Sequence, residues 1–220
     1  MKITIVVIGY NRIDSINRLL MSLSKAYYLD DRVDLIISLD RCDKTESFIK
    51  ELEKYNWKYG SKKIRSFEKR LGLRNHVIEC GKLVEGYDAI IVLEDDLLVS
   101  PYFYSYVKQT LKKYGEDDHI AGISLYKNEL NNGVNLPFVP SNNGYDVFMM
   151  QLSQSWGQCW TKKMWNEFYE WYQENCERDL KKIKNLPSYI SSWDERSWLK
   201  YHMAYTVENN KYHIYPYIFH

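Results

Sequence analysis

The sequence lacks the glycine-rich loops with which many nucleotide-binding proteins hold phosphate. Only 10 of its 220 residues are glycine, and the turn after the first apolar run, Gly9-Tyr10-Asn11-Arg12, contains no GxGxxG pattern. The GxxxxGK[ST] pattern of P-loop proteins and the HExxH pattern of zinc hydrolases are also absent. These absences exclude the dinucleotide-binding, P-loop and HExxH zinc classes.

A dominant charge and a cysteine framework are absent as well. The formal net charge is only +1, which argues against an obligate nucleic-acid partner. The four cysteines (Cys42, Cys80, Cys159 and Cys176) are widely spaced and form no CxxC pair. We interpret them as free thiols in a reducing compartment. The one basic cluster, residues 58–70, is interpreted as a solvated face, with contact to nucleotide phosphates or anionic lipid as the alternative.

No apolar run approaches the roughly 20 residues that a membrane span needs. The apolar run at residues 3–8 is too short for the core of a signal peptide. We therefore expect a cytoplasmic protein, and peripheral contact with the inner face of the membrane stays open.

What the sequence does contain is an alternation of apolar runs and amphipathic segments. β-Branched or apolar runs predict strands at residues 3–8, 33–39, 64–67 and 89–93. Helical periodicity predicts helices at about 14–28, 44–55 and 73–85. This order indicates an α/β protein with a doubly wound parallel sheet.

The second half is richer in loops and aromatic residues. Ser100 followed by Pro101 predicts a helix start, and strands are predicted at 120–125 and 147–152 with a long loop at 127–145 between them. Residues 153–160 are expected to be a loop leading to Thr161, the predicted cap of the next helix. No linker separates domains. We expect a single domain over 1–220, whose aromatic end is either truncated or packs on the core.

Three carboxylates, Glu94-Asp95-Asp96, follow the apolar run at 89–93 directly. They cannot be core, and they are expected beyond the carboxyl end of a strand, where open α/β sheets bind ligands. A period of two would point Glu94 and Asp96 one way and Asp95 the other. Without a phosphate-binding loop, Mg²⁺ or Mn²⁺ held by carboxylates could neutralise a diphosphate. The alternative is a solvated strand end.

Residues 91–103, IVLEDDLLVSPYF, closely resemble the acidic-motif segment of inverting GT-A glycosyltransferases of the N-acetylglucosaminyltransferase I type. Further matches follow in the expected order: Arg12, Asp40, Arg74-Asn75-His76, Trp156-Gly157 and Trp193-Asp194. The resemblance implies a GT-A fold, with a Rossmann-like, mostly parallel sheet flanked by helices and a small antiparallel, loop-rich acceptor region. Residues 1–100 would bind the nucleotide sugar, and 101–220 the acceptor.

The resemblance also implies roles on the donor side. Asp96 would hold the metal, Mn²⁺ or Mg²⁺, and Glu94 and Asp95 would bind the donor's sugar and ribose. Asp40 and His76 would contact uracil, and Arg12 the nucleotide. The structural alternatives are a satisfied core or surface histidine at position 76 and a pairing of Arg12 with Asp14 or Asp43.

On the acceptor side, the resemblance makes Asp194 the catalytic base, with Glu195 as its neighbouring rival. A carboxylate beside the large indole of Trp193 can have its pKa raised by desolvation. Asp194 could equally cap the following helix. Trp156 and Trp193 would line the acceptor cleft, or else cover the core.

The sequence thus predicts a metal-dependent enzyme that transfers a sugar from a UDP-sugar to a hydroxyl of a glycan, glycolipid or glycoprotein, with inversion. Bacterial glycan biosynthesis is the expected setting, by analogy. Two alternatives stay open. One is a non-catalytic subunit that stabilises a partner transferase, and the other is a sugar nucleotidyltransferase, although the glycine-rich loop usual in that class is missing.

Overall fold

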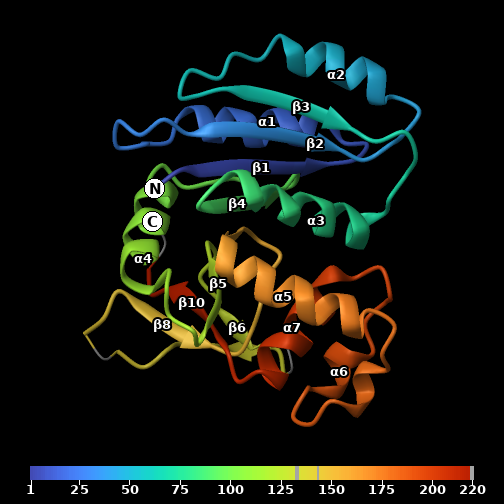
Figure 1. The fold of residues 1–220 in the computed structure, drawn as a ribbon. Helices are drawn as coiled ribbons and strands as arrows, with labels where there is room; N and C mark the ends of the chain where they lie inside the picture. Colours follow the sequence, from blue (N-terminus) through green and yellow to red (C-terminus); the bar gives the residue numbers. More distant parts are fainter. Residues whose placement is uncertain (132–133, 143, 219–220) are drawn as a thin grey trace.

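The computed structural model describes residues 1–131, 134–142 and 144–218. Within these residues the chain forms one eight-stranded sheet in the order β3-β2-β1-β4-β9-β5-β10-β8, with helices on both faces (Figure 1). Only β9 and β8 run antiparallel to their neighbours. The predicted fold class, α/β with a mostly parallel central sheet, is confirmed.

The sheet strands are β1 (Ile3–Gly9), β2 (Asp34–Leu39), β3 (Lys62–Ser66), β4 (Ala89–Glu94), β5 (Ile120–Ser124), β8 (Val147–Met150), β9 (Gln158–Thr161) and β10 (Tyr212–Pro216). A separate pair is formed by β6 (Leu130–Asn131) and β7 (Leu136–Pro137). The helices are α1 (Ile13–Ser24), α2 (Thr45–Glu53), α3 (Leu73–Gly81), α4 (Phe103–Tyr114), α5 (Lys162–Asn175), α6 (Ser188–Ser191) and α7 (Trp198–Glu208), with 3₁₀ turns η1 (Lys82–Gly86) and η2 (Leu180–Lys182).

The first four strands explain why the early apolar runs are uninterrupted. β1 pairs in parallel with β2 on one side and with β4 on the other, and every residue of β1 is buried. Helix α1 lies behind this part of the sheet and α3 in front of it (Figure 1). A strand covered on both faces needs apolar residues at every position.

The strand β9 was missed by the sequence prediction, which made this segment a loop. β9 lies antiparallel between β4 and β5, and all four of its residues are buried. Its sequence, QCWT, is short and polar at both ends, so it carries no apolar run. Trp160 fills the space beneath, with its ring 5.1 Å from that of Trp165 and 5.7 Å from that of Trp198.

The aromatic end of the chain packs on the core through Pro216, while Ile218 is exposed. β10 lies between β5 and β8, and Ile214 and Tyr215 are completely buried. Phe219 and His220 lie outside the described residues. The long loop predicted at 127–145 contains the short pair β6–β7, and it includes residues outside the described ranges.

Two predicted helix boundaries are wrong, and one predicted cap is confirmed. α4 begins at Phe103, because Ser100 first closes a turn in which its hydroxyl accepts a hydrogen bond from the Tyr102 N–H at 3.2 Å. α1 ends at Ser24, four residues early. Thr161 caps α5 as predicted, accepting a hydrogen bond from the Met164 N–H at 3.2 Å.

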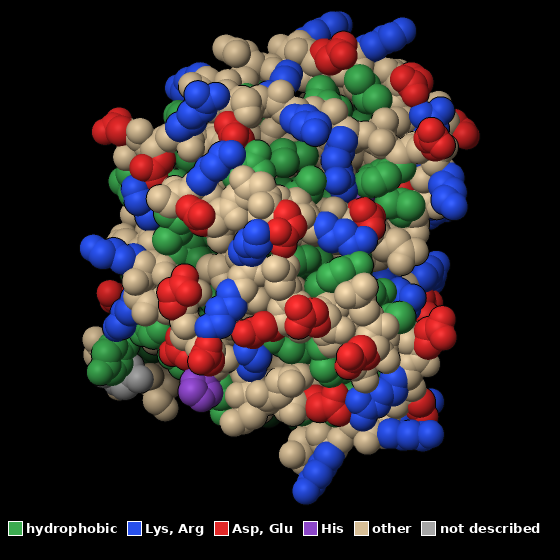
Figure 2. All heavy atoms as spheres, viewed as in Figure 1, with side chains coloured by type: hydrophobic (Ala, Val, Ile, Leu, Met, Phe, Trp, Pro, Cys, Tyr) green, Lys and Arg blue, Asp and Glu red, His purple; other side chains and the backbone are tan. Residues whose placement is uncertain are grey.

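The surface carries charges of both signs in a mixed pattern. Figure 2 shows Lys and Arg side chains interspersed with Asp and Glu over the whole face in view, in keeping with the small net charge. No helix in the described part of the chain is long and apolar enough to cross a membrane.

The contact between α3 and α5 depends on a glycine. A Cβ on Gly81 would lie 2.0 Å from the ring of Trp165, so the helices can approach only because this side chain is a hydrogen. Gly86, five residues later, has open space at the same position. The two glycines therefore form a matched pair for testing this packing.

We expect Gly81→Ala to destabilise the protein by about 1–3 kcal/mol, the usual result of overpacking a filled core. Gly86→Ala should leave the stability unchanged or slightly raised. Thermal unfolding measures both, at about 2–4 °C per kcal/mol for a chain of this size. Equal melting temperatures for the two variants would contradict the close contact of Gly81 with Trp165.

Candidate functional site

The polar residues singled out in the first half meet at one edge of the sheet. β1, β2 and β4 are parallel, so the segments after Gly9, Leu39 and Glu94 leave the sheet together. A cavity of about 390 Å³ lies at this edge. Five predicted site residues line it: Arg12, Asp40, His76, Glu94 and Asp95. We call it the strand-end cavity.

The three consecutive acids differ sharply in burial. Asp95 is buried, while 47% of the Asp96 side chain is exposed. Arg12 joins the two: its Nη2 donates to Asp95 Oδ1, and its Nη1 lies 3.2 Å from Asp96 Oδ2. Arg12 therefore pairs with the acidic motif, and not with Asp14 or Asp43.

Glu94, the first of the three acids in sequence, has a strongly raised pKa. Burial raises its pKa to about 7, with smaller contributions from the charges of Asp96 and Asp95. The Trp198 indole N–H donates to Glu94 Oε1 at 3.3 Å, which opposes this rise. Burial also raises the pKa of Asp95, although Arg12 lies against it. The expected alternation is wrong, since β4 ends at Glu94 and Asp95 lines the same cavity as Glu94.

Asp40 is committed to backbone groups. Its Oδ1 accepts hydrogen bonds from the N–H groups of Arg41 and Leu71, both at 2.8 Å, and its Oδ2 accepts one from Gly72 at 2.9 Å. Gly72 has φ +77°, which favours glycine. Asp40 thus ties the end of β2 to the loop that begins α3.

His76 lies in α3, and its ring is hydrogen-bonded to Ser38 of β2. Its Nε2 is 2.8 Å from Ser38 Oγ, and only 2% of the residue is exposed. Burial lowers its pKa to about 4, so the imidazole is neutral at pH 7. His76 therefore offers a neutral, hydrogen-bonded ring to the strand-end cavity.

Asp194 lines a second cavity of about 270 Å³, and Glu94 lines it too. We call it the base cavity. Asp194 accepts hydrogen bonds from the Arg196 side chain at 2.8 and 2.9 Å. This pairing lowers the pKa of Asp194 to about 2. The expected rise beside Trp193 is therefore wrong, because Asp194 is solvent-exposed. Asp194 is also not the cap of α7, which begins at Trp198.

Glu195 is occupied on both oxygens. Lys200 Nζ lies 2.5 Å from Oε1, and the Tyr201 hydroxyl donates to Oε2 at 2.6 Å. These hydrogen bonds, that of Lys200 first, lower the pKa of Glu195. Glu195 does not line the base cavity. Sequence reasoning missed Lys200, which is 1% exposed; the available signal was that it is the one Lys or Arg in an aromatic helix.

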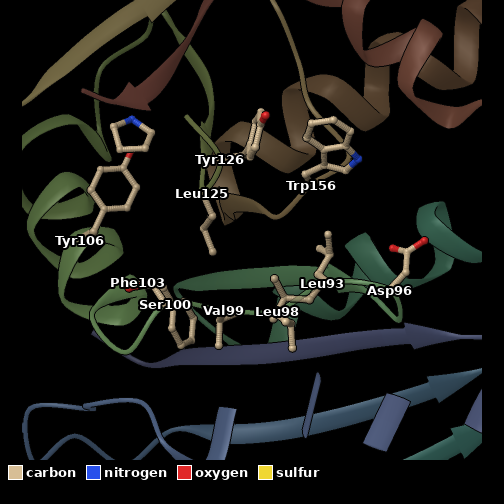
Figure 3. A pocket seen from close by; sticks show the side chains of 12 residues that line it. Leu93, Asp96, Leu98, Val99, Ser100, Phe103, Tyr106, Leu125, Tyr126 and Trp156 are labelled. Carbon is tan, nitrogen blue, oxygen red and sulfur yellow. The ribbon is translucent and has the colours of Figure 1, made fainter. Parts of the chain in front are cut away.

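Asp96 lines a third cavity, of about 440 Å³, together with Trp156. Figure 3 shows Asp96 at one end, and Trp156 and Tyr126 across from Leu98 and Val99. The Trp156 ring is half-exposed and meets Tyr126 edge-on at 4.4 Å.

Trp193 lies apart from these three cavities, and its ring meets Tyr189 edge-on at 6.2 Å. The structure thus brings Trp156 to a cavity beside the acids and does not bring Trp193 there.

The described residues contain no group of three or more His, Cys, Asp or Glu side chains that could enclose a metal ion. Among the predicted donor-side residues, the Asp96 carboxylate, half-exposed beside Arg12, is the oxygen ligand open to solvent. Mg²⁺ and Mn²⁺ prefer oxygen, and Mg²⁺ is often held by one or two carboxylates together with water and substrate phosphates. The site fits a metal shared with a phosphate ligand.

Comparison with known proteins agrees with this architecture. A family profile described as the SPBC1E8.03c C-terminal domain matches residues 14–179. No curated protein matches the chain. Among solved structures, S. aureus TarS 1–349 has a TM-score of 0.56 at 15% identity, covering 98% of this chain and 60% of that one. TarS 1–349 in complex with UDP gives a TM-score of 0.55 at 15% identity, with the same coverage.

The mannosyltransferase PcManGT from Pyrobaculum calidifontis, in complex with GDP-Man and Mn²⁺, has a TM-score of 0.54 at 13% identity, covering 74% of this chain and 45% of that one. The chain thus spans less than two thirds of the length of each of these proteins. At such low identities the likeness shows the fold, which is GT-A-like.

We expect Asp40→Asn to destabilise the protein by about 1–3 kcal/mol, because an amide nitrogen cannot accept from the N–H groups that Asp40 now satisfies. Asp43→Asn, an exposed change in the same segment, is the matched control and should have little effect. Urea unfolding measures both. Equal stability of the two variants would show that Asp40 does not hold the 70–72 loop.

Proposed function

Since the chain belongs to the SPBC1E8.03c C-terminal domain family and has a GT-A-like fold, we propose that it is a glycosyltransferase. It transfers a sugar from a UDP-sugar to a hydroxyl of a glycan or glycoconjugate, with inversion. The observation that carries this proposal is the strand-end cavity, where five polar side chains from three parallel strands and α3 converge beside Asp96.

Residues 1–100 bind the donor in this proposal. The neutral ring of His76 and the loop held by Asp40 form the uracil side of the strand-end cavity. Glu94 and Asp95 receive the sugar and the ribose. Arg12 brings a guanidinium next to the exposed carboxylate of Asp96, where the diphosphate of the donor would lie.

Asp96 holds the divalent cation together with the diphosphate. The half-exposed carboxylate of Asp96, next to the strand-end cavity, supports a metal shared with the donor. The PcManGT complex with GDP-Man and Mn²⁺ supports the same chemistry in a similar fold. When bound, such an ion neutralises charge on the departing nucleoside diphosphate.

Asp194 is the catalytic base, and the acceptor enters the base cavity from the side of residues 101–220. The acceptor hydroxyl gives its proton to Asp194 while its oxygen bonds to the anomeric carbon and the bond to UDP breaks on the opposite face. Asp194 lines the base cavity together with Glu94, whereas Glu195 does not line it, which favours Asp194. Trp156 beside Asp96 offers an aromatic face to the acceptor.

We expect UDP with Mn²⁺ to raise the melting temperature, since a ligand at 100 times its dissociation constant adds about 2.7 kcal/mol. Asp96→Asn should remove the contribution of Mn²⁺ and abolish transfer. Asp30→Asn, an exposed change at a positive φ that asparagine tolerates, is the matched control. Thermal shift and UDP-release assays with a panel of UDP-sugars measure these effects.

An unshifted melting temperature with every nucleotide sugar would favour a non-catalytic subunit. Release of pyrophosphate instead of UDP would favour a nucleotidyltransferase. Full activity of Asp96→Asn would contradict the metal assignment.

We expect Asp194→Asn to abolish transfer and to leave UDP binding intact, because only the proton acceptor is lost. Arg196→Gln should retain transfer but shift its acid limb to higher pH. With Arg196 present, the pKa of Asp194 is about 2 and the base is ionised across the accessible range. Without Arg196, the pKa should return toward the usual 3.9 or so, and activity should fall earlier on acidification.

The pH dependence of kcat between pH 3 and 7 measures this shift, with UDP binding followed at each pH. An unchanged acid limb in Arg196→Gln would argue against Asp194 as the titrating base.

A further inference from the structure

The backbone on both sides of Asp194 is held by buried or half-buried cations from two different helices. Lys200 of α7 donates from Nζ to the Trp193 carbonyl at 3.1 Å. Arg74 of α3 donates from Nη1 to the Glu195 carbonyl at 3.1 Å. The residues before and after Asp194 are therefore each tied to a cation.

The carboxylate of Glu195 completes this network. It accepts from Lys200 at 2.5 Å and from the Tyr201 hydroxyl at 2.6 Å, and that hydroxyl in turn accepts from Arg74 at 2.8 Å. The Arg74 guanidinium also lies 4.9 Å from the centre of the Tyr201 ring. Lys200 is 1% exposed, and a buried charge without a partner is costly. The Glu195 carboxylate is the partner that offsets this cost.

The network reaches the strand-end cavity through α3. Arg74 is the second residue of that helix, and the N–H groups of Leu71 and Gly72 just before it are held by Asp40. Leu73 lines both the strand-end cavity and the base cavity. The 70–72 loop, which lines the strand-end cavity, thus leads directly to Arg74, which holds the segment beside the base cavity.

The Asp194 carboxylate is bonded within its own segment: Oδ1 accepts from the Arg196 backbone N–H at 2.8 Å, and the Arg196 side chain that pairs with it is 85% exposed. Exposed ion pairs hold a geometry weakly. The position of the Asp194 carboxylate therefore depends on the backbone at 193–195.

We propose that Arg74 and Lys200 are positioning residues that fix Asp194 in the base cavity opposite the donor, and that Arg74 couples this placement to the nucleotide-side loop. This inference rests on the proposed function, in which Asp194 is the base. In this arrangement Glu195 is not a second base. Its carbonyl accepts a hydrogen bond from Arg74 and its carboxylate accepts one from Lys200, which holds both cations in place. A donor that orders the 70–72 loop would also order the segment that carries Asp194.

The test compares Arg74→Ala, Arg74→Lys and Lys200→Met with Arg178→Ala. Arg178 pairs with Glu208 at 2.9 Å, and neither residue lines the three cavities, so it serves as the control for losing an arginine ion pair. Arg74→Ala should lower kcat about 10- to 100-fold, since misplacing a reacting group by 1 Å can cost about 100-fold. The KM for the UDP-sugar and the affinity for UDP should stay within about twofold.

Arg74→Lys should recover part of the loss, because an ammonium can still donate to one carbonyl or hydroxyl. Arg178→Ala should keep the wild-type kcat. A loss of kcat in Arg74→Ala that merely follows a fall in melting temperature, or a wild-type kcat in this variant, would overturn the proposal.

Hydrogen exchange gives a readout that does not depend on turnover. The amides of Trp193, Arg196 and Ser197 should exchange faster in Arg74→Ala than in the wild type, and UDP should slow them in the wild type only. Unchanged exchange would overturn the coupling, even if Lys200→Met fails to fold. Absence of UDP binding and of transfer in the wild type would instead refute the proposed function.

Discussion

The site depends on the parallel register of β1 with β2 and β4. Ile8 lies opposite Glu94, and Gly9 opposite Leu39, so the three strands end at nearly the same level. Neighbouring parallel strands have their carboxyl ends at the same edge of the sheet. Polar residues that follow strands ending at one level therefore lie close together there. Without this register, Asp40 and the three acids would be scattered along the sheet.

Burial, more than charge, then separates the three acids. Asp95 is buried beside Arg12, Glu94 is desolvated with a pKa of about 7, and Asp96 is half-exposed. Three identical charges side by side would repel one another and act alike. Their different degrees of burial give the three acids different pKa values and different access to solvent. The three separate roles proposed for them require such differences.

The strong patterns were readable from sequence, and the context-dependent features were not. The apolar run before Glu94 and its acids needed only local composition, and so did the Thr161 cap. β9 was missed because its burial comes from β4 and β5 on either side and leaves no apolar run in QCWT. The low pKa of Asp194 comes from Arg196, two residues away, and Lys200 bonds Glu195, five residues away. These partners are close in sequence, but the loop geometry that pairs them and the burial of Lys200 exist only in the folded chain.

The position of β9 has a consequence for how the chain can be divided. This strand comes from the second half of the sequence, yet it is the direct neighbour of β4, whose carboxyl end carries the acids. A fragment ending near residue 100 would leave the β4 edge unpaired and the α3 face without Trp165. The two halves are therefore not independent folding units, because a strand of the second half completes the sheet of the first. Recombining such halves between relatives would have to preserve the β4–β9 seam before any feature of the cavities could matter.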